Sequence, residues 1–189
     1  MDAILLLLSV ALPWAAGTAW LRFLPKGAPL PWATAIGYGH FIGILALTLL
    51  MRATSLAGFK WNFWALAAAL AAFGLLPAWR CANRRAALAM PDIRADWAGL
   101  ARWKAAVAAI LLALVSVRYA GLLLEILWRP LFAWDAWMQW ATKARVWFEL
   151  GHMAPFVPVG EWIAADPAKV FTDPAPTSPA TVPLLQVWS

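Results

Sequence analysis

The stretch from Trp134 to Gly151 gathers residue types that could do chemistry at a membrane surface. One carboxylate, Asp135, stands close to two cations, Lys143 and Arg145, within a run of aromatic side chains. Asp135 occupies a natural N-cap position, where a carboxylate accepts hydrogen bonds from the free backbone N–H groups of a helix. We therefore treat this stretch as the candidate working surface of the protein.

The spacing within this stretch predicts a helix over residues 135–150 that lies on the membrane surface. Apolar residues recur at intervals of three and four, which gathers them on one face: Trp137, Trp140, Ala141, Ala144, Trp147 and Phe148. The other face carries Gln139, Thr142, Lys143 and Glu149. Tryptophan favours the headgroup zone of a bilayer, and Gly151 is a natural helix stop.

Composition identifies the class of the protein. Of 189 residues, 64% are hydrophobic and 13% are charged, whereas a soluble domain carries about 25% charged residues. The chain is therefore expected to be an all-α integral membrane protein with the lipid bilayer as its partner. Its net charge of +6 is concentrated in one loop, which sets topology and does not indicate a nucleic-acid partner. The single Cys81 excludes an internal disulfide.

Four hydrophobic runs predict a transmembrane bundle over residues 1–127, because each approaches the roughly 20 residues that span a bilayer. The expected spans are residues 3–24, 30–51, 61–79 and 105–127. In the second span, Gly37, Gly39 and Gly43 flank His40 and allow close helix packing. His40 is either a buried group with a function or a side chain bonded to a neighbouring helix.

The loop over residues 80–104 fixes the expected orientation. It is the most basic loop of the chain, with Arg80, Arg84, Arg85, Arg94, Arg102 and Lys104. Basic loops stay on the cytoplasmic side. The N-terminus and the 128–189 loop are then periplasmic, in a bacterial inner (cytoplasmic) membrane.

Two charges mark the fourth span. Arg118 and Glu125 are seven residues apart and share one helical face. Intramembrane charges usually face a bundle interior or a wet cavity. Arg118 could hold a lipid phosphate, or it could pair with an acid or with backbone carbonyls of a neighbouring helix.

The remainder divides into two parts. Residues 128–181 form an extracytoplasmic loop, which after the surface helix is rich in proline and is expected to be ordered against the membrane. Residues 182–189 look like the start of a truncated fifth span. On this reading the chain is a fragment.

The order of these features resembles the GT-C superfamily of polytopic membrane glycosyltransferases. The matching segments are Arg129-Pro-Leu-Phe-Ala-Trp-Asp-Ala-Trp137, Lys143-Ala-Arg-Val-Trp-Phe-Glu-Leu-Gly151 and a proline-rich stretch leading into Pro183-Leu-Leu185. In that superfamily an acidic extracytoplasmic loop and a surface helix precede the next span. The chain would then be the N-terminal part of a lipid-linked-sugar or protein mannosyltransferase-like enzyme, inactive on its own.

This resemblance implies sugar transfer from a polyprenyl-phosphate-linked donor to an acceptor hydroxyl on the periplasmic face. Asp135 would be the catalytic general base or would hold a divalent metal ion. Three cations could neutralise the donor phosphate: Arg118, Lys143 and Arg145. Trp137 and Trp140 could stack on sugar or polyprenol, or could be interface anchors. Glu161 and Asp173 are weaker carboxylate candidates, expected to be solvated.

The alternative is a non-enzymatic multi-pass membrane protein, such as a transporter or an assembly subunit. Three groups would then line a polar pathway: His40, Arg118 and Glu125. Other chemistries lack their motifs, because the chain has no Gly-rich phosphate loop, no serine nucleophile elbow and no His-Glu-x-x-His zinc site.

Overall fold

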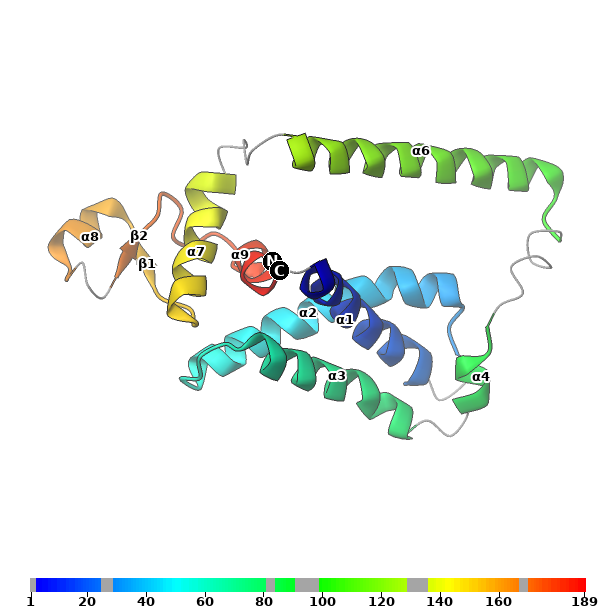
Figure 1. The fold of residues 1–189 in the computed structure, drawn as a ribbon, viewed down its shortest axis with the longest axis horizontal. Helices are drawn as coiled ribbons and strands as arrows, with labels where there is room; N and C mark the ends of the chain where they lie inside the picture. The colour runs from blue at the N-terminus through cyan, green and yellow to red at the C-terminus, as the bar shows by residue number, and fades with distance from the viewer. Residues whose placement is uncertain (1–2, 25–28, 81–83, 91–98, 129–135, 167–169) are drawn as a thin grey trace. The chain divides into compact units, whose positions relative to one another are not determined.

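The computed structural model describes residues 3–24, 29–80, 84–90, 99–128, 136–166 and 170–189. The chain divides into two units. Unit 1 comprises Met1–Ala89 together with Asp135–Ser189, and unit 2 comprises Met90–Trp134. The described part of the chain is mostly helical (Figure 1).

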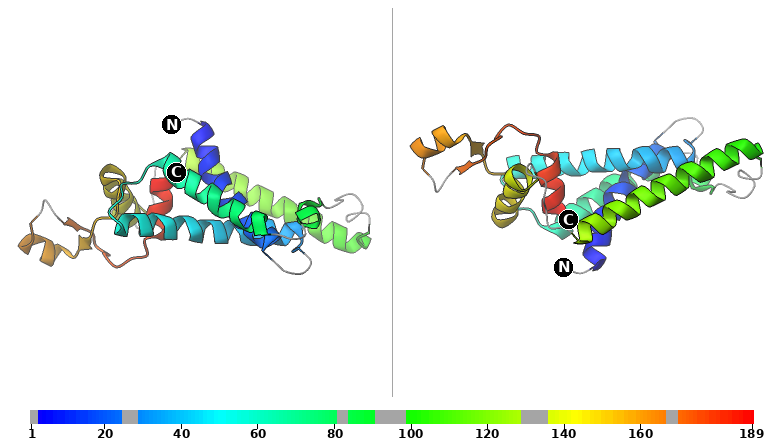
Figure 2. Two further views of the ribbon diagram at one scale, coloured as in Figure 1. Left: turned by 90° about the horizontal axis from the view of Figure 1, so that it is seen from below. Right: turned by 90° about the horizontal axis from the view of Figure 1, so that it is seen from above.

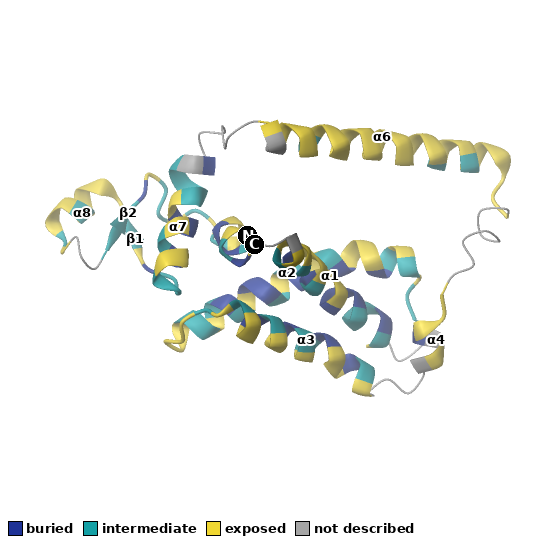
Figure 3. Cartoon of the chain, viewed as in Figure 1, coloured by how far each residue is buried: buried dark blue, intermediate teal, exposed yellow. Residues whose placement is uncertain are grey.

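Unit 1 is built around three helices: α1 (Ala3–Phe23), α2 (Trp32–Leu56) and α3 (Phe63–Arg80). α1 packs against both α2 and α3, and buried residues gather where the three helices meet (Figure 3). α1 and α2 are long and apolar enough to cross a membrane, whereas the apolar part of α3, Phe63–Trp79, is shorter.

Unit 2 contributes one long helix, α6 (Arg102–Trp128). Its segment Arg102–Glu125 has a mean hydropathy of 2.2, so it is the third helix, among the described residues, that could cross a membrane. The expected spans at 3–24, 30–51 and 105–127 thus correspond to long apolar helices. The span expected at 61–79 is a helix, but its membrane crossing stays a prediction.

Glycines allow α1 and α2 to approach closely, as the sequence predicted for Gly39 and Gly43. A Cβ placed on Gly43 would collide with the backbone of Pro13, and one on Gly39 would collide with Thr18. A Cβ on Gly37 would meet nothing within 4 Å, so this glycine takes no part in the packing. Backbone contact of this kind supplies the dispersion attraction that holds helices together in lipid.

Two loops differ from expectation. The second span was expected to end at residue 51, with Arg52 in the connector that follows, but α2 continues to Leu56 and Arg52 lies on the helix. Within the 80–104 loop, the chain forms a short helix α4 (Arg84–Leu88), which packs against α1. The buried side chain of Arg22 holds α4 there, because its Nε donates to Ala87 O at 3.0 Å.

Residues 136–189 form the C-terminal lobe. It contains a π-helix η1 (Ala136–Trp140), α7 (Ala141–Leu150), β1 (Phe156–Val157), α8 (Val159–Ala164), β2 (Phe171–Thr172) and α9 (Thr181–Trp188). The two strands pair in parallel, with Phe156 opposite Phe171 and Val157 opposite Thr172. The expectation of an all-α chain therefore missed this small strand pair. Its strands are two residues long, too short for an alternating pattern to reveal.

The C-terminal lobe is fastened to α1 through the hydrogen bond from Trp188 Nε1 to Ser9 O, to the last turn of α2 and to the α2–α3 connection. Trp61 N donates to Gly151 O at 2.6 Å, and Met153 N donates to Ser55 Oγ at 2.9 Å. α9 packs against α7 and α2 (Figure 2). The helix expected as the start of a fifth span is therefore a docked element of unit 1, and its membrane crossing stays a prediction.

Candidate functional site

The predicted surface helix is present but begins with an irregular turn. Residues 136–140 form η1, α7 follows, and Gly151 ends it in the left-handed conformation at φ 72°. The predicted stop at Gly151 is thus confirmed, because a glycine adopts this conformation without a Cβ clash. Asp135 and the side chain of Trp137 lie outside the described residues, so the proposed N-cap and stacking roles stay predictions.

The two faces of α7 are only partly as expected. Ala144 and Trp147 are buried, as predicted for the apolar face, and Trp147 Nε1 donates to Ala154 O at 3.0 Å. Phe148, expected on the same face, is 70% exposed. Lys143, expected on the solvated polar face, is 1% exposed. The reason is that the side of α7 that carries Lys143 packs against residues 175–178 of the same lobe.

Lys143 is the centre of a buried polar cluster. Its ammonium donates to Ala175 O at 2.7 Å, to Ser178 Oγ at 2.6 Å and to Pro176 O at 3.3 Å. Oδ1 of Asp173 lies 3.8 Å from the same nitrogen. An ammonium has three N–H donors, and these acceptors engage them. Lys143 therefore ties α7 to the segment that follows β2.

Asp173 is the other half of this cluster, and it was expected to be solvated. Its side chain is fully buried, and Oδ1 accepts from Ala175 N at 2.6 Å. Among the described residues, Oδ2 has no hydrogen-bond partner, and neither does Thr172 Oγ1. Burial lowers the pKa of Lys143 from its ordinary value of 10.5, while the negative charge of Asp173 acts in the opposite direction.

The other predicted site residues have different surroundings, each within its own unit. Arg145 is 82% exposed in its side chain and pairs with Glu149, one turn further along α7, at 3.0 Å. Trp140 is half-buried at the end of η1 and Glu161 is exposed on α8. Arg118 is exposed on α6, in unit 2. The structure thus brings Lys143 together with Asp173 and leaves Arg145 on the surface.

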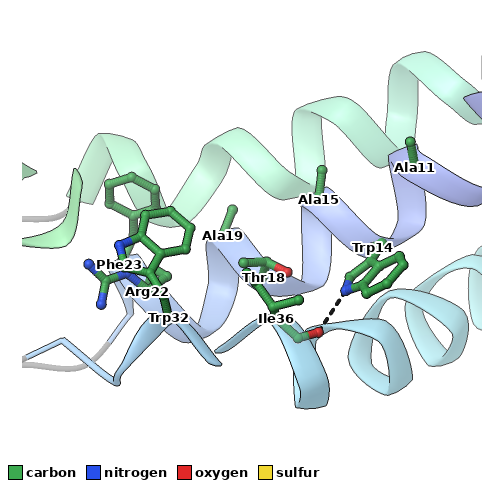
Figure 4. A pocket seen from close by; sticks show the side chains of 9 residues that line it. All are labelled: Ala11, Trp14, Ala15, Thr18, Ala19, Arg22, Phe23, Trp32 and Ile36. Carbon is green, nitrogen blue, oxygen red and sulfur yellow. Dashed lines mark hydrogen bonds between the residues drawn. The ribbon is translucent and has the colours of Figure 1, made fainter. Parts of the chain in front are cut away.

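A pocket of about 470 Å³ lies along α1 and α2 (Figure 4). Alanines 11, 15 and 19 line it, together with Trp14, Thr18, Arg22, Phe23, Trp32 and Ile36. Trp14 Nε1 donates across it to Ile36 O at 2.6 Å. The guanidinium of Arg22 lies 4.5 Å from the centre of the Trp32 ring and donates to the carbonyls of Leu30 and Ala87. Arg22 was not among the predicted site residues, because one cation at the end of a span gives no signal beyond topology.

His40 lies in a second pocket, of about 350 Å³, between α1, α2 and α9. Its ring meets Trp14 of α1 edge-on, with 5.3 Å between the ring centres. Gln186 and Trp188 also line this pocket. The contact between His40 and α1 is aromatic, and the hydrogen bond to a neighbouring helix expected for His40 stays a prediction.

The part of the chain that the structure describes contains no group of three or more His, Cys, Asp or Glu side chains placed to hold a metal ion. Comparisons with protein-family models, curated proteins and solved structures give no match for this chain.

Proposed function

We propose that this chain is part of a membrane glycosyltransferase that moves a sugar from a polyprenyl-phosphate donor to an acceptor hydroxyl on the periplasmic face. The observation that carries the proposal is an ordered aromatic helix held at the end of a helical bundle. η1 and α7 are fixed there by the Trp61–Gly151 and Ser55–Met153 hydrogen bonds. A lipid-linked donor needs a rigid reacting surface of this kind.

Asp135 directly precedes η1 in the chain and is the proposed general base or divalent-metal ligand. A carboxylate in either role would activate the acceptor hydroxyl. Arg145, on the exposed side of α7, is the proposed partner of the donor phosphate, because its guanidinium can pair with two phosphate oxygens. Trp137 and Trp140 would stack on the sugar or the polyprenol.

Lys143 receives a different role in this proposal. Its amine is already bonded to three acceptors within the C-terminal lobe, so it holds the working surface together and is not offered as a donor-phosphate ligand. Arg118 lies ten residues before the end of α6, about 15 Å along the helix axis. This is deeper than the headgroup level at which a polyprenyl phosphate sits.

The proposed orientation in a bacterial inner membrane follows the basic 80–104 loop. Reporters fused after Arg85 and after Gly151 test it. We expect a cytoplasmic signal from the first position and a periplasmic signal from the second. A periplasmic signal after Arg85 would reverse the orientation and remove the C-terminal lobe from the periplasm.

Sugar transfer in membranes that contain the complete enzyme to which this part is proposed to belong, with and without the Asp135→Asn change, tests the catalytic proposal. We expect the rate to fall by about 100-fold or more, the usual effect of removing a general base. Glu161→Gln, which changes an exposed acid of the same lobe, should leave the rate unchanged. Full activity in the Asp135→Asn membranes would refute the role of Asp135.

A second candidate function, a non-enzymatic multi-pass membrane protein, is favoured by the Lys143–Asp173 cluster. Two of the charged groups considered for chemistry pair with each other inside the lobe, as they would in a purely structural domain. Membranes containing the complete wild-type protein would then transfer no sugar from any polyprenyl-phosphate donor, and Asp135→Asn would change no transfer rate.

A further inference from the structure

Arg118 occupies a costly position on α6. The apolar segment Arg102–Glu125 is centred near residues 113 and 114, so Arg118 lies only about 7 Å from the middle of the segment along the axis. A bilayer core extends about 15 Å to either side of its middle. A guanidinium at this depth is far more stable when it meets a carboxylate, polar protein groups or water.

The direction of the side chain makes it difficult for the guanidinium of Arg118 to reach water at either end of α6. The nearer end is the C-terminal one, at Trp128. Cα–Cβ bonds in a helix tilt toward its N-terminus, so the stem of Arg118 starts toward the middle of the bilayer. The N-terminal end of α6 at Arg102 is about 24 Å away along the axis, beyond the reach of one side chain. Snorkelling, the usual way for Arg to keep its charge wet, is therefore disfavoured here.

The face of α6 that carries Arg118 is shaped for another helix. We name the Arg118 face by its members at spacings of three and four: Leu114, Arg118, Gly121 and Glu125. Leu114 is exposed, and a Cβ placed on Gly121 would meet nothing within 4 Å. A glycine one turn from a charged residue lets a partner backbone come close enough for short hydrogen bonds.

The other apolar helices of the chain do not supply an acid for Arg118. The segments that form α1, α2 and α3 contain no Asp and no Glu. A second copy in the same orientation would place Arg118 opposite Arg118, and like charges repel. Glu125 on α6 itself lies seven residues further on, about 10 Å along the axis and toward the helix end, whereas the stem of Arg118 starts in the opposite direction. Charge complementarity therefore favours a carboxylate on a helix other than these.

We propose that the Arg118 face of α6 is a docking surface for a transmembrane helix of another polypeptide segment, one that carries a single Asp or Glu at the depth of Arg118. The carboxylate would accept two parallel hydrogen bonds from the guanidinium. The partner helix would lie close to Gly121. This inference does not depend on the glycosyltransferase proposal, because it uses only the depth, direction and surroundings of Arg118.

The test uses the full chain in phosphatidylcholine vesicles with a designed probe. The probe is a leucine–alanine peptide of about 20 residues with one Glu at the matching depth, and its controls carry Gln or Leu there. Energy transfer between the labelled chain and the labelled peptide reports association. We expect the Glu peptide to bind about tenfold more tightly than the Leu peptide, since interhelical polar pairs in lipid have about this strength.

Variants of the chain locate the effect. Arg118→Leu should reduce binding of the Glu peptide to the level of the Leu peptide, while Arg118→Lys should keep part of it. Arg102→Leu, which removes a cation at the helix end, should leave binding unchanged and serves as the matched control. Equal binding of all three peptides would overturn the proposal, and so would equal binding of the Glu peptide by the wild type and by Arg118→Leu. Either result would mean that the guanidinium of Arg118 does not bind a carboxylate on a partner helix.

Two further results would also overturn it. Energy transfer between two labelled copies that is lost in Arg118→Leu would assign the face to a second copy of this chain. If anionic lipid abolishes binding of the Glu peptide to the wild-type chain but does not change the weaker binding to Arg118→Leu, Arg118 would be assigned to a lipid phosphate.

Discussion

The ammonium of Lys143 lies 3.8 Å from Oδ1 of Asp173, and both side chains are buried inside the C-terminal lobe. The pair joins α7 to the segment after β2, and the carbonyls of Ala175 and Pro176 complete the surroundings of the ammonium. A buried ion pair is often no more stabilising than well-packed apolar side chains of similar volume, because the cost of removing both charges from water offsets their attraction. We infer that this pair fixes how the 170–180 segment lies against α7.

Breaking the pair on one side should destabilise the lobe. Lys143→Met removes the hydrogen bonds to Ala175 O, Pro176 O and Ser178 Oγ and also the cation beside Asp173, which together costs about 3–5 kcal/mol. Hydrogen exchange at Phe171 N and Asp173 N checks this, because these amides bond to Pro155 O and Val157 O across the strand pair. The double variant Lys143→Met/Asp173→Leu should recover part of the protection, since no charge is then left buried.

The matched control for that experiment is the exposed pair on the same helix. Arg145→Met removes the contact between Arg145 and Glu149, which are largely in solvent. Exposed helical pairs contribute about 0.3–0.5 kcal/mol. An equal loss of protection in Arg145→Met and Lys143→Met would show that the Lys143 cluster has no special role.

The pH dependence of lobe stability should carry the signature of Lys143. Because burial lowers its pKa in the folded chain, the unfolded chain holds more protons than the folded one between that lowered pKa and 10.5. Stability rises with pH wherever the unfolded state binds more protons. The free energy of unfolding of the wild type should therefore rise, relative to Lys143→Met, as the pH increases through this window. A relative fall in the same window would show that the pKa of Lys143 is raised.

The α1–α2 contact should be sensitive to a single methyl group. Gly43→Ala forces a Cβ into the backbone of Pro13, and such overpacking costs about 1–3 kcal/mol. Gly37→Ala, in open space on the same helix, should be neutral or slightly stabilising, because alanine is the better helix former. Thermal unfolding of both variants in detergent compares them. Equal melting temperatures would contradict the close approach at Gly43.

The docking of α9 should depend on the indole of Trp188. Its Nε1 donates to Ser9 O at 2.7 Å, and its ring stacks on Phe63 with 4.6 Å between the centres. Trp188→Phe removes the hydrogen bond and should cost about 1 kcal/mol. Trp188→Ala removes the stacking as well and should cost about 3–5 kcal/mol. Denaturant unfolding of the two variants checks this order. Trp128→Phe, at an 81% exposed position, should have little effect.

The helices long enough to span a bilayer could be read from the sequence to within a few residues at most ends. A bilayer-length run of apolar residues is a local property that survives in almost any tertiary arrangement. The stop at Gly151 was equally local, because the residue that ends α7 needs a positive φ. The end of α2 was placed five residues too early, since Arg52 continues the helix without breaking its hydrogen-bond ladder.

Sequence periodicity alone predicted that η1 and α7 would form a helical stretch and that Ala144 and Trp147 would share its apolar face. It could not establish what covers that face. Lys143 lies one turn from Trp140 and from Trp147, at the margin of the aromatic face, so spacing allowed it to be either buried or solvated. In the tertiary structure Lys143 is buried, because the carbonyls and the carboxylate that contact its ammonium belong to a segment about 30 residues further along the chain. Long-range contacts of this kind leave no local pattern in the sequence.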